Sequence, residues 1–156
     1  MTISSTNSPP RADIAYQPAL VAELIDEHRS MARHLAQVLT SFEDDDLSTT
    51  GRLLDQFGHE TTAHVYKETT KLYLYLQYAL SDRPDEFAQM RKFRKEMDRI
   101  VADTMDFLER YKTLETDPGK QSSFKTEMEG LRDRWLARVK TEESILFPMY
   151  RPPAGT

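Results

Sequence analysis

The residues best able to bind a metal ion are two histidines and a group of carboxylates at helical spacing. His64 and Glu68 are four residues apart, so in a helix they project from one face, one turn apart. His28 and the adjacent pair Glu142 and Glu143 lie on or beside the apolar stripes of two other segments. Burying an unpaired charge is costly, so each of these side chains requires a partner inside the fold. Two imidazoles and two or more carboxylates that converge between helices are typical of a metal site in a helical bundle.

Each of these residues also has a simpler interpretation. A lone histidine such as His28 is more often a hydrogen-bonded core residue, His-x-x-x-Glu occurs by chance in many helices, and a Glu-Glu pair is usually solvated. Arg138 lies on the same apolar stripe as Glu142 and therefore also needs a buried partner. The remaining histidines, His34 and His59, fall away from the main stripes, and we expect them at the surface or at an edge.

Four long segments must position these residues, and their apolar periodicity predicts helices. The expected helices cover residues 18–43, 48–80, 85–115 and 122–147. The connections between them are short, so sequential helices should be antiparallel neighbours. We therefore expect an all-α fold, an antiparallel up-down-up-down four-helix bundle over residues 18–150. Residues 1–17 are expected to form a flexible N-terminal tail, and residues 151–156 a C-terminal tail.

Composition excludes several classes of protein. The 156 residues correspond to about one domain, and 21 basic against 26 acidic residues give a net charge of −5, which argues against nucleic-acid binding. The absence of cysteine excludes disulfides, zinc ribbons, iron–sulfur clusters and a cysteine nucleophile. No apolar run approaches the roughly 20 residues of a membrane span, and no secretory signal is present. We expect a cytoplasmic protein without membrane contact, and no motif indicates an enzyme.

The second predicted helix is apolar on nearly all sides near its end. Its large side chains there are Tyr66, Leu72, Tyr73, Leu74, Tyr75, Leu76, Tyr78 and Leu80. A helix in a small bundle normally keeps one face polar. This segment is therefore either a broad core face or a surface for a homodimer or another protein partner.

Three motifs together carry a resemblance to a known family. They are Glu27-His28, then His64-Val65-Tyr66-Lys67-Glu68, then Arg138-Val139-Lys140-Thr141-Glu142-Glu143 followed by Leu146-Phe147-Pro148. This pattern resembles the hemerythrin-like (HHE cation-binding) family over about residues 18–150. The resemblance implies an antiparallel four-helix bundle that holds two iron ions. The motif of the last helix is the most specific of the three.

Carried over to this chain, the resemblance assigns one iron to His28 and His64, with Glu68 and Glu143 as the bridging carboxylates. The ligands of the second iron are missing, because Arg138 stands at the position of the histidine on the fourth helix and the third helix has no histidine. The inward positions of the third helix hold Met97, Ile100 and Thr104. We therefore expect no di-iron centre and no reversible dioxygen binding.

Two outcomes then remain for the site. In one, His28, His64, Glu68 and Glu143 bind a single Fe, Mn or Zn ion, for which two imidazoles and two carboxylates are adequate ligands. In the other, no metal binds and the Arg138 guanidinium supplies the positive charge by pairing with Glu68 and Glu143. The sequence favours the second outcome, because an arginine among the ligands repels a divalent cation.

These considerations lead to three functional hypotheses. The first is a hemerythrin-like domain without a complete di-iron site that acts as a regulatory or interaction module. The second is a sensor or storage protein that binds one metal ion per bundle. The third is a sigma-factor-binding transcription regulator of the bacterial Rsd/AlgQ type, which Leu131-Arg132-Asp133-Arg134-Trp135-Leu136 faintly resembles.

Overall fold

The computed structural model describes residues 15–153, and within this range the chain forms helices and no strands. Its main helices are α1 (Leu20–Glu43), α2 (Leu47–Lys67), α4 (Pro84–Arg110) and α5 (Pro118–Thr141). The π-helical turn η2 (Glu68–Tyr73) and helix α3 (Leu74–Ala79) continue α2, while the π-helical turn η4 (Glu142–Leu146) and the 3₁₀ turn η5 (Phe147–Met149) continue α5. A 3₁₀ turn, η3 (Leu114–Thr116), lies between α4 and α5.

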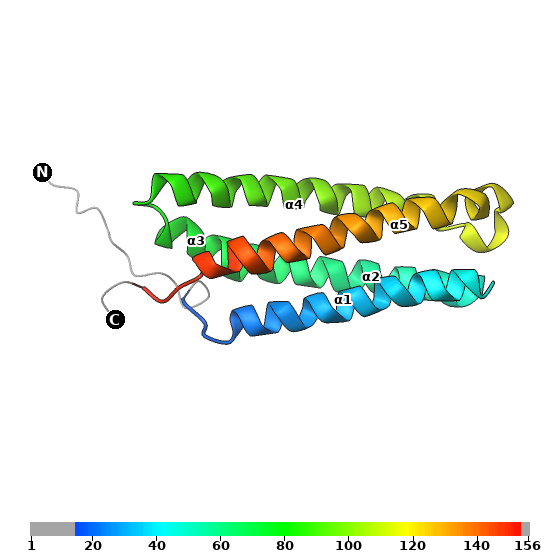
Figure 1. The fold of residues 1–156 in the computed structure, drawn as a ribbon, viewed down its shortest axis with the longest axis horizontal. Coiled ribbons are helices and arrows are strands. Elements are labelled where there is room, and N and C mark those ends of the chain that lie inside the picture. The colour runs from blue at the N-terminus through cyan, green and yellow to red at the C-terminus, as the bar shows by residue number, and fades with distance from the viewer. Residues whose placement is uncertain (1–14, 154–156) are drawn as a thin grey trace, which may run out of the picture.

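These elements form a bundle of four long rods. Figure 1 shows that the chain reverses direction at each connection, so the rods lie lengthwise beside one another. Helix α1 contacts α2 and α5, and α4 contacts the same two helices. The expected all-α four-helix bundle is confirmed.

The boundaries of the last two helices differ from the prediction. Helix α4 ends at Arg110, and α5 begins at Pro118, four residues before the expected start. The reason is local, because the Asp117 side chain accepts a hydrogen bond from the Lys120 backbone N–H at 3.2 Å and thereby caps the first turn. Pro118 then occupies the first helical turn, where its missing N–H has no cost.

Residues near both ends of the described chain contact the bundle. Residues 1–14 and 154–156, which the sequence assigns to the tails, lie outside the described range. The Gln17 backbone N–H donates a hydrogen bond to the Tyr150 hydroxyl at 2.7 Å, and the Tyr16 ring stacks on that of Tyr150. The Tyr75 hydroxyl donates to the Arg151 carbonyl at 2.6 Å. The described parts of both expected tails are therefore anchored at the same end of the bundle.

Two apolar clusters fill the bundle, and a polar layer separates them. The cluster near the α1–α2 connection includes Leu35, Phe57, Phe124 and Trp135. The cluster near the chain ends includes Leu24, Leu72, Met90 and Phe147. Between them lie buried charged or polar side chains: His28, His64, Glu68, Arg138 and Glu142. The buried charged side chains of the described residues are thus gathered at one level of the core, where they must compensate one another.

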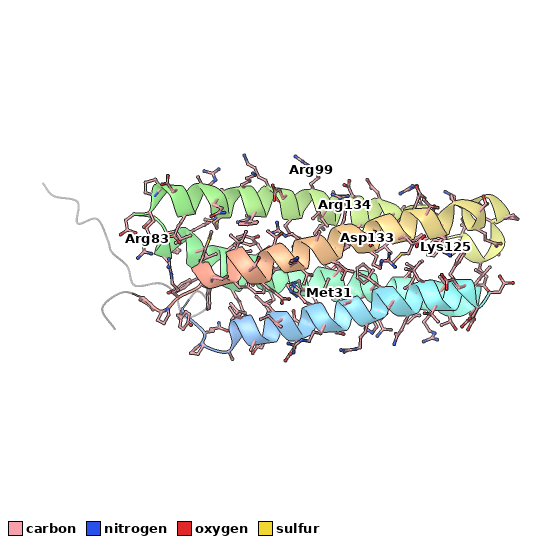
Figure 2. The ribbon with its side chains drawn as sticks, viewed as in Figure 1. Met31, Arg83, Arg99, Lys125, Asp133 and Arg134 are labelled. Carbon is pink, nitrogen blue, oxygen red and sulfur yellow. The ribbon has the colours of Figure 1, made fainter. Side chains whose placement is uncertain are left out.

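The outer surface is mainly polar. In Figure 2 Met31 belongs to the interior of the bundle, whereas Arg99, Lys125 and Asp133 lie on its outside. No described helix combines the length and apolar character needed to cross a membrane.

The tyrosines of the second rod are divided between core and surface. Tyr73 and Tyr75 are buried, while Tyr66 and Tyr78 are 71% and 58% exposed. The apolar surface that this rod offers to a partner is therefore smaller than the sequence suggests.

Candidate metal centre

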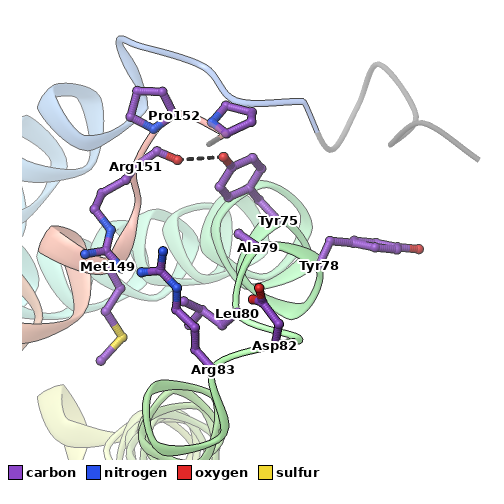
Figure 3. Close-up of a pocket in the computed structure, with 10 residues that line it drawn as sticks. Tyr75, Tyr78, Ala79, Leu80, Asp82, Arg83, Met149, Arg151 and Pro152 are labelled. Atoms are coloured by element: carbon purple, nitrogen blue, oxygen red, sulfur yellow. Dashed lines mark hydrogen bonds between the residues drawn. The ribbon is translucent and has the colours of Figure 1, made fainter. Parts of the chain in front are cut away.

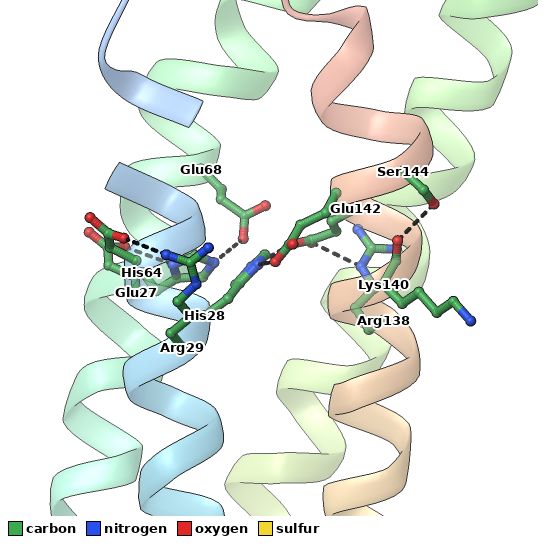
Figure 4. Close-up of polar contacts among 11 residues, drawn as sticks. Glu27, His28, Arg29, His64, Glu68, Arg138, Lys140, Glu142 and Ser144 are labelled. Atoms are coloured by element: carbon green, nitrogen blue, oxygen red, sulfur yellow. Dashed lines mark hydrogen bonds and ion pairs between the residues drawn. The ribbon is translucent and has the colours of Figure 1, made fainter. Parts of the chain in front are cut away.

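Four buried side chains from three rods meet in the polar layer (Figure 4). They are His28 of α1, His64 of α2, Glu68 at the start of η2 and Glu142 at the start of η4. None is more than 2% exposed. One potential ligand atom from each lies within 4.8 Å of those of the other three. Two imidazole nitrogens and two carboxylate oxygens are thus brought to one point in the core.

The helical register explains why these side chains face inward. His28 lies one turn from the buried Leu24 and Met31, and it shares their face of α1. His64 and Glu68 are one turn apart on the second rod. Both carboxylates of the cluster begin a π-helical turn, in Glu68–Tyr73 and Glu142–Leu146. Such turns are rare and occur frequently at functional sites.

The contacts within the cluster are short, but several of the atoms lack hydrogen bonds. His28 Nε2 lies 2.9 Å from Glu142 Oε1, and His64 Nε2 lies 2.7 Å from Glu68 Oε1. Even so, His64 Nε2, both Glu68 oxygens and Glu142 Oε1 are buried without a hydrogen-bond partner among the described residues. A buried polar atom left without any partner costs about 1–3 kcal/mol. A cation at this point would interact with all of these atoms, so the donor set fits a metal ion.

Two further carboxylates orient the imidazoles from outside the cluster. Glu27 Oε1 lies 2.7 Å from His64 Nδ1, and Glu143 Oε2 lies 2.8 Å from His28 Nδ1. An ionised carboxylate only accepts hydrogen bonds, so each Nδ1 carries the proton. Each Nε2 faces the inner carboxylates. This arrangement of histidine and outer carboxylate is common in metal sites, where it fixes the ring and increases its basicity.

Glu27 was not among the site residues expected from the sequence. Its Oε2 also accepts a hydrogen bond from the Lys67 ammonium group, so its carboxylate joins α1 to α2. The sequence feature that could have indicated its role is its position next to His28 in the Glu27-His28 motif.

The chain matches the hemerythrin HHE cation-binding domain over residues 19–150. The chain belongs to this family. The match covers the whole bundle, including every side chain of the buried cluster. Comparison with curated proteins and with solved structures finds no match.

In this HHE domain Glu142, and not Glu143, is the second carboxylate of the cluster. Glu142 is fully buried, whereas the Glu143 side chain is 35% exposed and contacts the outer nitrogen of His28. Neighbouring helical residues point about 100° apart, so only one of the two can face the core. The resemblance assigned Glu143 to this position, and the structure instead places it outside the cluster. The signal for Glu142 was its place on the same stripe as Trp135 and Arg138.

Arg138 of the HHE domain is buried beside the cluster. Its Nε donates to Glu142 Oε2 at 3.0 Å, and its Nη2 donates to the Tyr73 hydroxyl at 2.9 Å. Its guanidinium lies 5.3 Å from the centre of the Phe93 ring, a cation–π contact, and its Nη1 lies 3.7 Å from Glu96 Oε2. The expected pairing of Arg138 with Glu68 and Glu143 is therefore wrong, since the carboxylate to which it donates a hydrogen bond is that of Glu142.

Helix α4 contributes packing and charge to the polar layer rather than ligands. Phe93 and Glu96 are the α4 residues that contact Arg138, which fixes the register of this helix. The Thr104 hydroxyl accepts a hydrogen bond at 2.9 Å from Nε1 of Trp135, a residue of the apolar cluster near the α1–α2 connection. Met97 is buried in the same cluster as Trp135, and Ile100 packs against that cluster.

Burial and neighbouring charges shift the pKa values of the cluster in opposite directions. Burial alone would lower the pKa of His64, but Glu68 and Glu27 outweigh it and raise that pKa to about 9. Burial and the nearby Glu142 raise the pKa of Glu68 to about 7 against the effect of His64. Burial would also raise the pKa of Glu142, but His28 and Arg138 together lower it. The site is therefore most strongly anionic at Glu142.

The other histidines lie outside the cluster. His34 Nδ1 lies 3.0 Å from Glu60 Oε1, and the Ser30 hydroxyl donates to the same carboxylate. His34 is 16% exposed, and His59 is exposed. Both positions agree with the prediction of edge or surface residues.

One pocket lies at the end of the bundle, away from the cluster. It has a volume of about 400 Å³. As Figure 3 shows, its lining includes Tyr75, Tyr78, Arg83 and Arg151, and it contains none of the four cluster residues. The cluster is therefore enclosed by the bundle rather than placed in this pocket.

Proposed function

We propose that this HHE domain binds one divalent transition-metal ion through His28, His64, Glu68 and Glu142. The observation that carries the proposal is the set of buried ligand atoms in short contact that lack hydrogen bonds. If protonated histidines compensated these carboxylates, we would expect well-aligned hydrogen bonds between the two kinds of side chain. Ligand atoms arranged around one shared metal ion do not need to be aligned with one another in this way.

The donor set indicates which ions fit. Two imidazoles and two carboxylates suit first-row ions such as Fe²⁺, Mn²⁺ or Zn²⁺. When bound, the ion supplies two positive charges to a core that holds Glu68 and Glu142. Glu27 and Glu143 keep the protons on the outer nitrogens of the histidines, so the Nε2 lone pairs are directed inward.

We infer that the centre holds one ion and not two. The position that the family pattern assigns to a further histidine ligand is occupied by Arg138. The contacts of this guanidinium with Glu142, Tyr73 and Phe93 fill the space next to the cluster. A permanent cation there repels a second metal ion, so dioxygen carriage by two irons is not expected.

We further propose that the ion acts through the fold, as a sensor or regulatory device, and not as a catalyst. The four ligands are at most 2% exposed, and apolar clusters lie on both sides of them. A ligand that binds only the folded state increases stability by mass action. Metal supply would then set the population of the ordered bundle.

The experiment compares matched pairs of histidine substitutions. Chelator-treated protein is titrated with Fe²⁺ under anaerobic conditions and with Zn²⁺, and bound metal is determined by elemental analysis after gel filtration. The wild type should bind one ion per chain. His28→Ala/His64→Ala should bind none, while the control His34→Ala/His59→Ala should bind one. Two ions per chain, or none in the wild type, would overturn the proposal.

A further inference from the structure

Arg138 is a buried cation next to a proposed cation site. Its side chain is 3% exposed and lies between α5, α4 and the second rod. Three neighbours hold its guanidinium in one place: the Glu142 carboxylate, the Tyr73 hydroxyl and the Phe93 ring. The guanidinium is always protonated, so this positive charge is permanent.

Glu142 connects this charge directly to the cluster. Its Oε2 accepts from Arg138 Nε at 3.0 Å, while its Oε1 lies 2.9 Å from His28 Nε2. The Glu142 carboxylate thus directs its Oε2 atom toward the guanidinium and its Oε1 atom toward the other proposed metal ligands. Arg138 therefore holds Oε1 in the direction of the cluster and also reduces the negative charge that the cluster offers to an ion.

The charges around the centre decide which ions are tolerated. In the fully buried group, Glu68 and Glu142 contribute two negative charges, Arg138 contributes one positive charge, and neutral imidazoles contribute none. The outer carboxylates are counted apart, because Glu27 is paired with Lys67 and Glu143 is 35% exposed. A divalent ion leaves this group with a charge of about +1, and a trivalent ion with about +2. Glu96 compensates only weakly, because it lies 3.7 Å from the guanidinium and its side chain is 44% exposed. Excess charge is unfavourable in a core of low dielectric.

We propose that Arg138 is a specificity-determining residue that makes the centre select divalent over trivalent ions. The inference rests on the proposed function, since it concerns the same site. It assigns to the guanidinium the electrostatic role of a second cation, fixed in the protein. If the bound metal is iron, the same charge favours the ferrous over the ferric form.

The test measures the ratio of two dissociation constants, for Zn²⁺ and for citrate-buffered Ga³⁺, a trivalent ion without redox chemistry. Arg138→Gln removes the charge and should shift this ratio by about tenfold or more toward Ga³⁺. Arg138→Lys keeps the charge and should leave the ratio close to that of the wild type. Arg134→Gln is the matched surface control, because Arg134 lies one turn earlier on α5 and is 43% exposed; it should change nothing.

Glu96→Gln tests the same idea in the opposite direction and does not alter the core. It removes the anion beside Arg138 Nη1, so the ratio should shift away from Ga³⁺. The shift should be smaller than that of Arg138→Gln, because Glu96 is 44% exposed, but it should have the opposite sign. That sign decides the question even if Arg138→Gln does not fold. For iron-loaded protein, a tenfold change in the ferric-to-ferrous preference corresponds to about 59 mV in the midpoint potential. The potential should fall in Arg138→Gln and rise in Glu96→Gln.

The possible failures are distinguishable. A wild type that binds no divalent ion overturns the proposed function and the inference with it. Normal Zn²⁺ binding with an unchanged ratio in both Arg138→Gln and Glu96→Gln overturns the inference alone. An equal shift in Arg138→Lys and Arg138→Gln also overturns it, because contact geometry and not charge would then be responsible.

Discussion

Arg138 and Glu142 form a buried ion pair one helical turn apart, with 3.0 Å between Nε and Oε2 and side chains that are 3% and 0% exposed. The pair lies in the layer that separates the two apolar clusters. Neither charge reaches solvent, so each depends on its buried partners for compensation. Arg138 is compensated mainly by Glu142, and Glu142 is compensated by Arg138 together with His28. The pair is therefore a sensitive point of the metal-free bundle.

Arg138→Met should therefore destabilise the metal-free protein strongly. Removing one partner of a buried pair typically costs about 3–5 kcal/mol, because the other charge is left uncompensated. The loss should be smaller in acid, where Glu142 can take up a proton. Urea unfolding with chelator measures the effect. The control Arg134→Met removes an exposed arginine paired with Asp103 at 2.7 Å and should cost less than about 1 kcal/mol. Equal midpoints for wild type and Arg138→Met would show that the pair contributes nothing.

Glu142→Gln and Glu143→Gln distinguish the roles of two neighbouring carboxylates, which could not be distinguished from the sequence alone. Glutamine keeps the size of the side chain and removes its charge. Glu142→Gln removes a proposed ligand and should abolish stoichiometric Zn²⁺ binding. Glu143→Gln removes the outer carboxylate that orients His28 and should weaken binding by about 10–100-fold. Isothermal titration of both variants gives the comparison. A larger effect at Glu143 would restore the assignment made from the resemblance.

The bundle and most of the candidate site follow from periodicity. His28 falls on a stripe that steps by three and four from Leu24 to Leu35, so its inward direction is determined once α1 is recognised. The spacing of His64 and Glu68 likewise places both on one face. These inferences need only the period of a helix.

The incorrect predictions concern places where the backbone departs from the period of an α-helix, or where the contacts of a residue come from other helices. The π-helical turn at Glu142–Leu146 changes the rotation of the chain at the point where Glu142 and Glu143 had to be distinguished. The partners of Arg138 on other helices, Tyr73 and Phe93, depend on how the rods pack, which a single helix pattern does not contain. The early start of α5 depended on one capping contact of Asp117.

Asp117→Ala tests that capping contact. The Asp117 carboxylate accepts from the Lys120 N–H, and loss of an N-cap typically costs about 0.5–2 kcal/mol. Ser122→Ala is the matched control, because the sequence placed the helix start there, while in the structure the residue is exposed within the first turns of α5. It should change stability by less than about 0.5 kcal/mol. Urea unfolding decides between the two starts, and a larger loss in Ser122→Ala would contradict the observed boundary.

The stability of the metal-free protein should fall between pH 6.5 and about 9. Burial would lower the pKa of His64, but Glu68 and Glu27 raise it from 6.5 to about 9. Because the pKa in the folded state is the higher one, this stabilisation is complete below pH 6.5 and is lost as the pH rises through 9. Glu68 acts in the same direction but at lower pH, since burial and Glu142 raise its pKa from 4.5 to about 7, so its contribution is lost between these two values.

Metal should reverse this trend. An ion binds the imidazole nitrogen only after its proton has left, so the affinity for Zn²⁺ should increase over the same pH range. The measurement is urea unfolding at pH 6, 7, 8 and 9, once with chelator and once with excess Zn²⁺. The two curves should diverge as the pH rises, and His64→Gln should reduce the slope of the chelated series. A chelated wild type whose stability is constant or increases from pH 6.5 to 9 would show that His64 is not held as an imidazolium between Glu27 and Glu68.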